Sequence, residues 1–117
     1  MLSTLAAVAA AFTLQATPQP TAVEAICQVN QNAVRPCQIA MAEQDGNIGL
    51  FFAIDEVLIG FVGTQTTPTK IAVRVVGVDD QAAPVTSGYC QVAQGIVTCT
   101  ATDGTGETLT VRARPTQ

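Results

Sequence analysis

Apolar and polar residues alternate along much of the chain after residue 26, which is the pattern of strands with one face on a core. Residues 37–43 alternate in this way, and Asp45 and Gly46 then supply the dipeptide of a tight hairpin turn. Residues 48–54 follow as the expected partner strand. The pattern therefore predicts an antiparallel hairpin here.

The rest of the chain continues with short apolar or β-branched segments between turn residues. Asp55 and Glu56 form either a tight turn or a solvent-facing interruption of one long strand. Further strands are expected at residues 57–62, 70–78, 89–93, 96–102 and 107–113, with a Thr/Pro loop at 63–69 and turns at 79–84, 94–95 and 103–106. Seven or eight short strands with regular turn signals predict an all-β domain, either a small antiparallel β-sandwich (immunoglobulin-like) or a barrel.

The four cysteines form two pairs that are close in sequence, Cys27 with Cys37 and Cys90 with Cys99. If Gln94 and Gly95 make a two-residue turn, Cys90 faces Cys99 in a non-hydrogen-bonded pair, where Cα atoms are about 4.5 Å apart. Cys27–Cys37 follows by elimination and closes residues 28–36. A zinc site is disfavoured, because there is no Cys-x2-Cys and no histidine. Two disulfides are therefore predicted.

Residues 2–14 form an uncharged run of about the length of a signal-peptide core, too short to span a bilayer. Small-residue cleavage patterns end at Ala16 and, as the better match, at Ala25. We expect a secretory signal at residues 1–25 and one β domain at 26–117, secreted or periplasmic, with no integral membrane span in the mature chain. No basic residue precedes the run, and the alternative is an N-terminal core helix.

Composition and charge exclude several classes of function. The net charge is −4, and the five cations form no run, which argues against binding to nucleic acid or to an acidic membrane surface. With no histidine there is no Ser-His or Cys-His pair, and no phosphate-binding or dinucleotide motif occurs. No catalytic residue, metal site or cofactor is predicted.

The acidic residues give two weaker hypotheses. Asp55-Glu56 and Asp79-Asp80 are adjacent pairs, and neighbours on a strand point to opposite faces, so a small hydrolase would need one carboxylate from each pair in a common cleft. The stretch from Asp103 to Glu107 faintly resembles a calcium loop, but it lacks the ligand alternation and the flanking helices. Turn and solvent-facing roles are the favoured interpretation.

The loop of residues 28–36, clamped at its ends, is a candidate interaction loop, with Asn30, Asn32, Val34 and Arg35 as its candidate contact residues. A secreted protease inhibitor could present Arg35 in this way. Pro36 weakens that alternative, because it restricts Arg35 and removes the following N–H.

One local resemblance bears on function. Residues 95–103, Gly-Ile-Val-Thr-Cys-Thr-Ala-Thr-Asp, followed by residues 106–112, Gly-Glu-Thr-Leu-Thr-Val-Arg, resemble the last two strands of hyalin-repeat and related immunoglobulin-like modules. The resemblance implies an extracellular, non-enzymatic adhesion or spacer module. A Cys90–Cys99 bridge departs from that fold, since it leaves Cys99 unavailable for a bridge between sheets.

Together these patterns predict a secreted, non-catalytic binding or structural module. Its partner is expected to be an extracellular protein or glycan, which the sequence does not specify.

Overall fold

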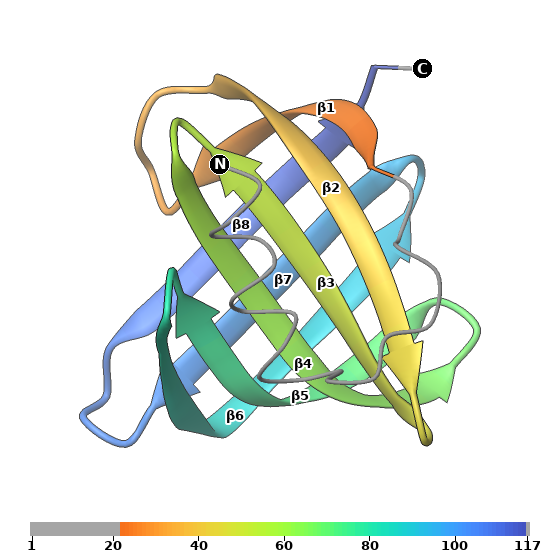
Figure 1. The fold of residues 1–117 in the computed structure, drawn as a ribbon, viewed down its shortest axis with the longest axis vertical. Coiled ribbons are helices and arrows are strands. Elements are labelled where there is room, and N and C mark those ends of the chain that lie inside the picture. Colours follow the sequence, from red (N-terminus) through yellow and green to blue (C-terminus); the bar gives the residue numbers. More distant parts are fainter. Residues whose placement is uncertain (1–21, 117) are drawn as a thin grey trace.

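Eight antiparallel strands close into one barrel in the computed structural model, which describes residues 22–116 (Figure 1). Each strand pairs with the next along the chain, and β8 pairs back with β1. The strands are β1 (Val23–Val29), β2 (Arg35–Gln44), β3 (Asn47–Ile54), β4 (Val57–Thr67), β5 (Lys70–Val78), β6 (Gln81–Ala93), β7 (Ile96–Asp103) and β8 (Thr108–Pro115). Within residues 22–116 no helix is long and apolar enough to cross a membrane.

The barrel interior is filled by alternate side chains from all eight strands. Phe52 and Phe61 are fully buried and meet edge to face, with ring centroids 5.9 Å apart and ring planes at 82°. Aliphatic side chains and the four cysteines surround this pair. An eight-stranded barrel is just wide enough for side chains to fill it, so a packed core rather than a channel is expected.

The all-β prediction is confirmed, and of its two forms the barrel is the one observed. A sandwich needs two separate sheets, whereas here the pairing of β1 with β8 closes a single sheet. The immunoglobulin-like sandwich implied by the local resemblance is therefore not the architecture of this chain. Closure also leaves no unpaired edge strand among residues 22–116.

Both predicted disulfides are present. Cys90 lies directly opposite Cys99 in the register that a Gln94-Gly95 turn imposes, with Cα atoms 4.0 Å apart. Cys27 and Cys37 join β1 to β2 with Cα atoms 5.8 Å apart. All four side chains belong to the core cluster, so each bridge stabilises the barrel from inside.

The first strand is a correction to the sequence analysis. No strand was expected before residue 37, yet β1 runs from Val23 to Val29 and pairs with both β2 and β8. The expected domain boundary at residue 26 therefore falls within β1. The strand was missed because its first residues matched a cleavage pattern and its last residues were assigned to the clamped loop.

Two predicted loops are also shorter than expected. β4 continues through most of the Thr/Pro segment to Thr67, and β6 begins at Gln81, so only Asp79 and Asp80 turn the chain. Gly63 permits the extension, because a Cβ there would overlap the carbonyl oxygen of Ala72 on β5. Pro84 is tolerated next to a register irregularity in the pairing of β5 with β6, where a missing N–H is acceptable.

Asp55 and Glu56 form the tight turn between β3 and β4 rather than an interruption of one strand. Both have positive φ angles, of 50° and 70°. The corresponding turns at residues 45–46 and 94–95 place glycine second, with φ of 84° and 77°. Glu56 thus occupies a position where glycine is the residue without steric cost.

Candidate functional site at the acidic end of the barrel

Four of the connections lie at one end of the barrel, because consecutive strands run in opposite directions. They join β1 to β2, β3 to β4, β5 to β6 and β7 to β8. Six of the nine acidic residues of the chain are at this end. We call it the acidic end; its carboxylates belong to Asp55, Glu56, Asp79, Asp80, Asp103 and Glu107.

Arg35 contributes a cation to the acidic end and is paired with Asp55. Its Nε donates to Asp55 Oδ2 at 2.8 Å and its Nη2 to Asp55 Oδ1 at 3.1 Å, a bidentate pair between half-exposed side chains. The hydrogen bonds from Arg35, assisted by its positive charge, lower the pKa of Asp55 and raise that of Arg35. The pair joins the start of β2 to the β3–β4 turn.

Asp79 ties the β5–β6 turn to the neighbouring strand. Its Oδ1 accepts the Leu58 N–H at 3.0 Å, and its own N–H donates to the Leu58 carbonyl at 2.7 Å. The carboxylate therefore has a structural role. Through it the acidic pair at residues 79–80 is held beside β4, which begins directly after Glu56.

Asp103 organises the β7–β8 turn from within. Its Oδ1 accepts the hydroxyl of Thr105 at 2.6 Å, the N–H of Thr105 at 2.9 Å and the N–H of Glu107 at 3.1 Å. These hydrogen bonds, led by the Thr105 hydroxyl, lower the pKa of Asp103. Such a carboxylate stabilises the turn. Among the described residues no group of three His, Cys, Asp or Glu is placed to hold a metal ion.

The hydrolase hypothesis gains little from this geometry. The two predicted acidic pairs do lie at the same end, but Asp55 is paired with Arg35 and Asp79 bonds to backbone. The pKa values of Asp55 and Asp103 are both lowered. A general acid needs a raised pKa, so these groups suit fixed negative charge better than proton transfer.

Two hollows open at the acidic end. The larger, about 540 Å³, has a mixed lining, in which Val76, Ala101 and Leu109 stand together with Asp103 and Glu107. The smaller, about 370 Å³, has a mostly apolar lining that includes Val29, Ile54 and Ile59 as well as Arg35 and Asp55. The acidic end therefore combines apolar surface with carboxylates.

The four predicted contact residues of the 28–36 loop differ in how far their side chains are free to meet a partner. Asn30 has a φ of 53° and binds β8, its Oδ1 accepting the Thr110 N–H at 2.9 Å. Asn32 donates its N–H to Val29, so both asparagines hold the loop in place. Val34 is 58% exposed, and the guanidinium of Arg35 is bound to Asp55. A protease inhibitor would have to break that ion pair to present Arg35.

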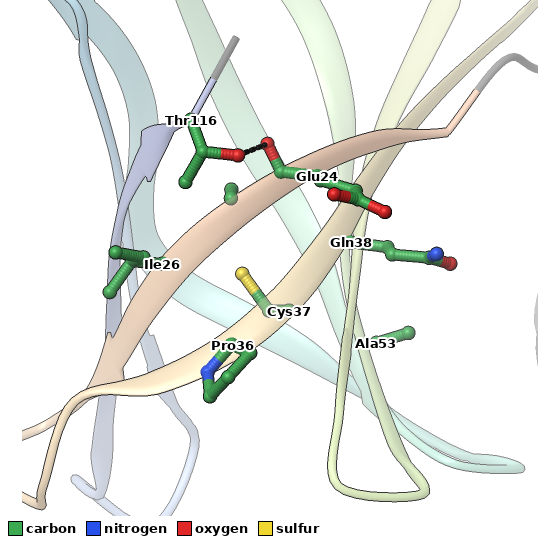
Figure 2. A pocket seen from close by; sticks show the side chains of 8 residues that line it. Glu24, Ile26, Pro36, Cys37, Gln38, Ala53 and Thr116 are labelled. Atoms are coloured by element: carbon green, nitrogen blue, oxygen red, sulfur yellow. Dashed lines mark hydrogen bonds between the residues drawn. The ribbon is translucent and has the colours of Figure 1, made fainter.

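Another hollow, about 510 Å³, lies on the side of the barrel over β1 and β2 (Figure 2). Ile26, Pro36 and Ala53 give it an apolar wall, and Glu24 contributes the only titratable side chain among its lining residues. Thr116 donates its hydroxyl to the Glu24 carbonyl at 3.2 Å. With one carboxylate in its lining, this hollow lacks the clustered charge that distinguishes the acidic end.

The acidic end was not predicted as a unit. The sequence left Asp55-Glu56 open between a turn and a solvent-facing interruption and placed Asp79-Asp80 in a turn, and in the structure both pairs are turns. The available signal was their spacing: in a meander of antiparallel strands, every second connection lies at the same end. The predicted strands already separate the turns carrying Asp55, Asp79 and Asp103 by two strands each, so these turns could have been grouped from the sequence.

Comparisons with known proteins define the fold and no more. No protein-family model matches the chain, and no curated protein matches it. A solved structure of a redesigned β-barrel is similar, with a TM-score of 0.50, 11% sequence identity, and coverage of 85% of this chain and 92% of that chain. At this identity the likeness supports the barrel architecture alone.

Proposed function

We propose that this chain is an exported, non-catalytic binding module whose acidic end binds a cationic partner with apolar groups, such as a basic segment of an extracellular protein. The observation that carries the proposal is that six carboxylates and two hollows lie at the same end of a closed barrel, with Asp55, Asp103 and Glu107 among the residues that line the hollows. Clustered like charges attract an oppositely charged partner over several ångströms, and the hollows offer apolar contact once it arrives.

The disulfides and the N-terminal run support the export part of this proposal. Two disulfides indicate an oxidising environment. Of the two cleavage patterns, a cut after Ala25 would remove the first three residues of β1, including Ala25 itself, which is 3% exposed and pairs with Cys37. A cut after Ala16 leaves β1 whole. We therefore expect the mature chain to begin at Thr17, which the intact mass of the exported protein would test.

The binding proposal is tested with a short peptide that alternates lysine and leucine, titrated into the protein in a calorimeter. The variant Glu56→Gln with Asp80→Asn removes two exposed charges from the acidic end and should weaken binding about three- to tenfold at low salt. The matched control, Glu24→Gln with Glu43→Gln, removes two charges remote from this end and should change the affinity less than about twofold. Equal losses in the two variants, or no binding by the native chain, would refute the proposal.

A further inference from the structure

Two arginines lie close together on the outside of β8. Arg112 and Arg114 are exposed, whereas Ala113 between them is buried in the core. Residues two apart on a strand point to the same side and are about 7 Å apart, so the two guanidinium groups share one outer surface. Within residues 22–116 neither of them forms an ion pair, in contrast to Arg35, which is held by Asp55.

The surroundings of the two arginines are apolar or neutral. Arg114 lies opposite Ile26 of β1, and Arg112 lies opposite Gln28. Ile26 is 43% exposed and Val34 is 58% exposed. A hollow of about 360 Å³ opens here, and no aspartate or glutamate of residues 22–116 lines it. We call this surface the arginine face; its residues are Ile26, Gln28, Val34, Ile96, Arg112 and Arg114.

The arginine face has the chemistry that the acidic end is proposed to bind. It places two cations beside exposed apolar side chains, whereas the acidic end places carboxylates beside apolar lining residues. Glu56 and Asp80 are exposed, and in the described part of the chain their carboxylates have no hydrogen-bonding partner. These charges are therefore available to guanidinium groups from another molecule.

We propose that the acidic end of one copy of this chain binds the arginine face of a second copy. The inference rests on the proposed function of the acidic end and names one partner for it. Arg112 lies four residues beyond Thr108, where β8 starts at the acidic end, or about 13 Å along the strand. In a closed barrel the two surfaces are held apart, so their contact has to be between molecules.

This contact joins two different surfaces, so it is heterologous. Each copy keeps one unused surface after binding one neighbour, and association continues beyond a dimer as the protein concentration rises, unless the copies close into a ring. The net charge of −4 makes copies repel each other at long range. Association therefore depends on the oriented contact of unlike charges and should weaken when salt screens them.

Sedimentation velocity over micromolar to millimolar concentrations at low salt tests the self-association. The average mass of the native protein should rise with concentration. Arg112→Gln with Arg114→Gln should lower the association constant about three- to tenfold, since it removes both exposed cations from the arginine face. The matched control, Lys70→Gln with Arg74→Gln, removes two exposed cations from β5 and should change it less than about twofold. Equal losses in the two variants would overturn the inference.

Mixing two variants tests whether the contact joins unlike surfaces. The Arg112/Arg114 variant keeps its acidic end, and Glu56→Gln with Asp80→Asn keeps its arginine face. An equimolar mixture should therefore associate more strongly than either variant alone, and the lysine–leucine peptide should dissociate it by occupying the acidic end. A mixture that associates no better than its components would contradict the heterologous contact.

The peptide also separates this inference from the proposed function. The Arg112/Arg114 variant should bind the lysine–leucine peptide as the native protein does, which also shows that it is folded. A native protein that stays monomeric over the whole concentration range but binds the peptide would overturn the self-association and leave the proposed function standing. A native protein that neither associates nor binds the peptide would refute both.

Discussion

The two halves of this barrel are built from different sequence patterns. In the first half, β3 and β4 are apolar on both sides, with Phe52 and Phe61 inside and Phe51 and Leu58 outside. In the second half, β7 and β8 alternate, with Val111 inside and a threonine face outside, which we define as Thr98, Thr100, Thr102, Thr108 and Thr110. In Figure 1, β2 and β3 lie at the front and β7 and β8 behind them.

On the threonine face the outward side chains form hydrogen bonds with one another. Thr100 and Thr110 lie opposite each other with hydroxyl oxygens 2.9 Å apart, and Thr102 and Thr108 form a second such pair at 2.9 Å. Their methyl groups shield the sheet while the hydroxyls bond to one another and to water. A strand that is apolar on both faces is typical of burial on both faces. A strand with alternating residues is typical of burial on one face only.

The halves also differ in what stabilises the interior. The first half contributes two phenylalanine rings in edge-to-face contact. The second half contributes small side chains, among them Ala101, Val111 and Ala113, together with the Cys90–Cys99 bridge. A chain with 4% aromatic residues cannot fill a whole barrel with rings. Each half has one disulfide, but β5 to β8 contain no phenylalanine, so the Cys90–Cys99 bridge stabilises a core without such rings.

The largest expected effect comes from the aromatic contact. Phe61→Ala removes a fully buried ring from the barrel centre and should lower the free energy of unfolding by about 3–5 kcal/mol, because a cavity remains that the closed sheet cannot collapse to fill. Urea denaturation monitored by circular dichroism measures this. Val97→Ala, a partly buried position in the second half, is the control and should cost much less. Equal losses at the two positions would remove the distinction between the halves.

Next in size is the bridge of the second half. Cys90→Ala with Cys99→Ala should cost about 2.5–3 kcal/mol, the chain-entropy value for so short a loop. The Cys27–Cys37 bridge closes a loop of similar length, so Cys27→Ala with Cys37→Ala serves as the comparison. We expect the loss at Cys90 and Cys99 to be the larger, because β5 to β8 contain no phenylalanine to stabilise that half of the core. Thermal unfolding of both variants decides the order, and the reverse order would contradict this expectation.

A smaller change of opposite sign is expected at the β3–β4 turn. Glu56 has a φ of 70°, so Glu56→Gly should stabilise the barrel by about 1 kcal/mol by removing the strain of a side chain in left-handed backbone. The equivalent change in the second half, Gly95→Ala at a φ of 77°, should destabilise it by about 1 kcal/mol. Thermal unfolding at neutral pH measures both shifts. A destabilising Glu56→Gly would show that the carboxylate stabilises the turn.

How far the sequence predicted this structure depends on how local each feature is. The Asp45-Gly46 and Gln94-Gly95 turns fix the registers of their hairpins, and the latter placed Cys90 opposite Cys99 correctly. Closure is not local: it depends on β1 pairing with β8, more than 80 residues away. The extension of β4 past Gly63 likewise depends on contact with β5. The acidic end combines residues from distant turns, which periodicity alone does not bring together.

The smallest expected effect compares one carboxylate from each half. The pKa values of Asp55 and Asp103 are both lowered, so each favours the folded state above about pH 4, and that contribution is lost as the pH falls through the lowered pKa. Their causes differ: Asp55 depends on a half-exposed guanidinium, and Asp103 on the hydroxyl and backbone N–H groups of its own turn.

Salt should therefore separate the two groups, because it screens exposed ion pairs but not hydrogen bonds between neutral donors and a carboxylate. Carboxyl chemical shifts recorded by NMR at low and high salt should show the pKa of Asp55 rising toward its ordinary value while that of Asp103 stays lowered. Arg35→Gln should raise the pKa of Asp55 at either salt concentration and leave Asp103 unchanged. An equal response of both groups to salt would mean that the Arg35 charge contributes nothing specific to the acidic end.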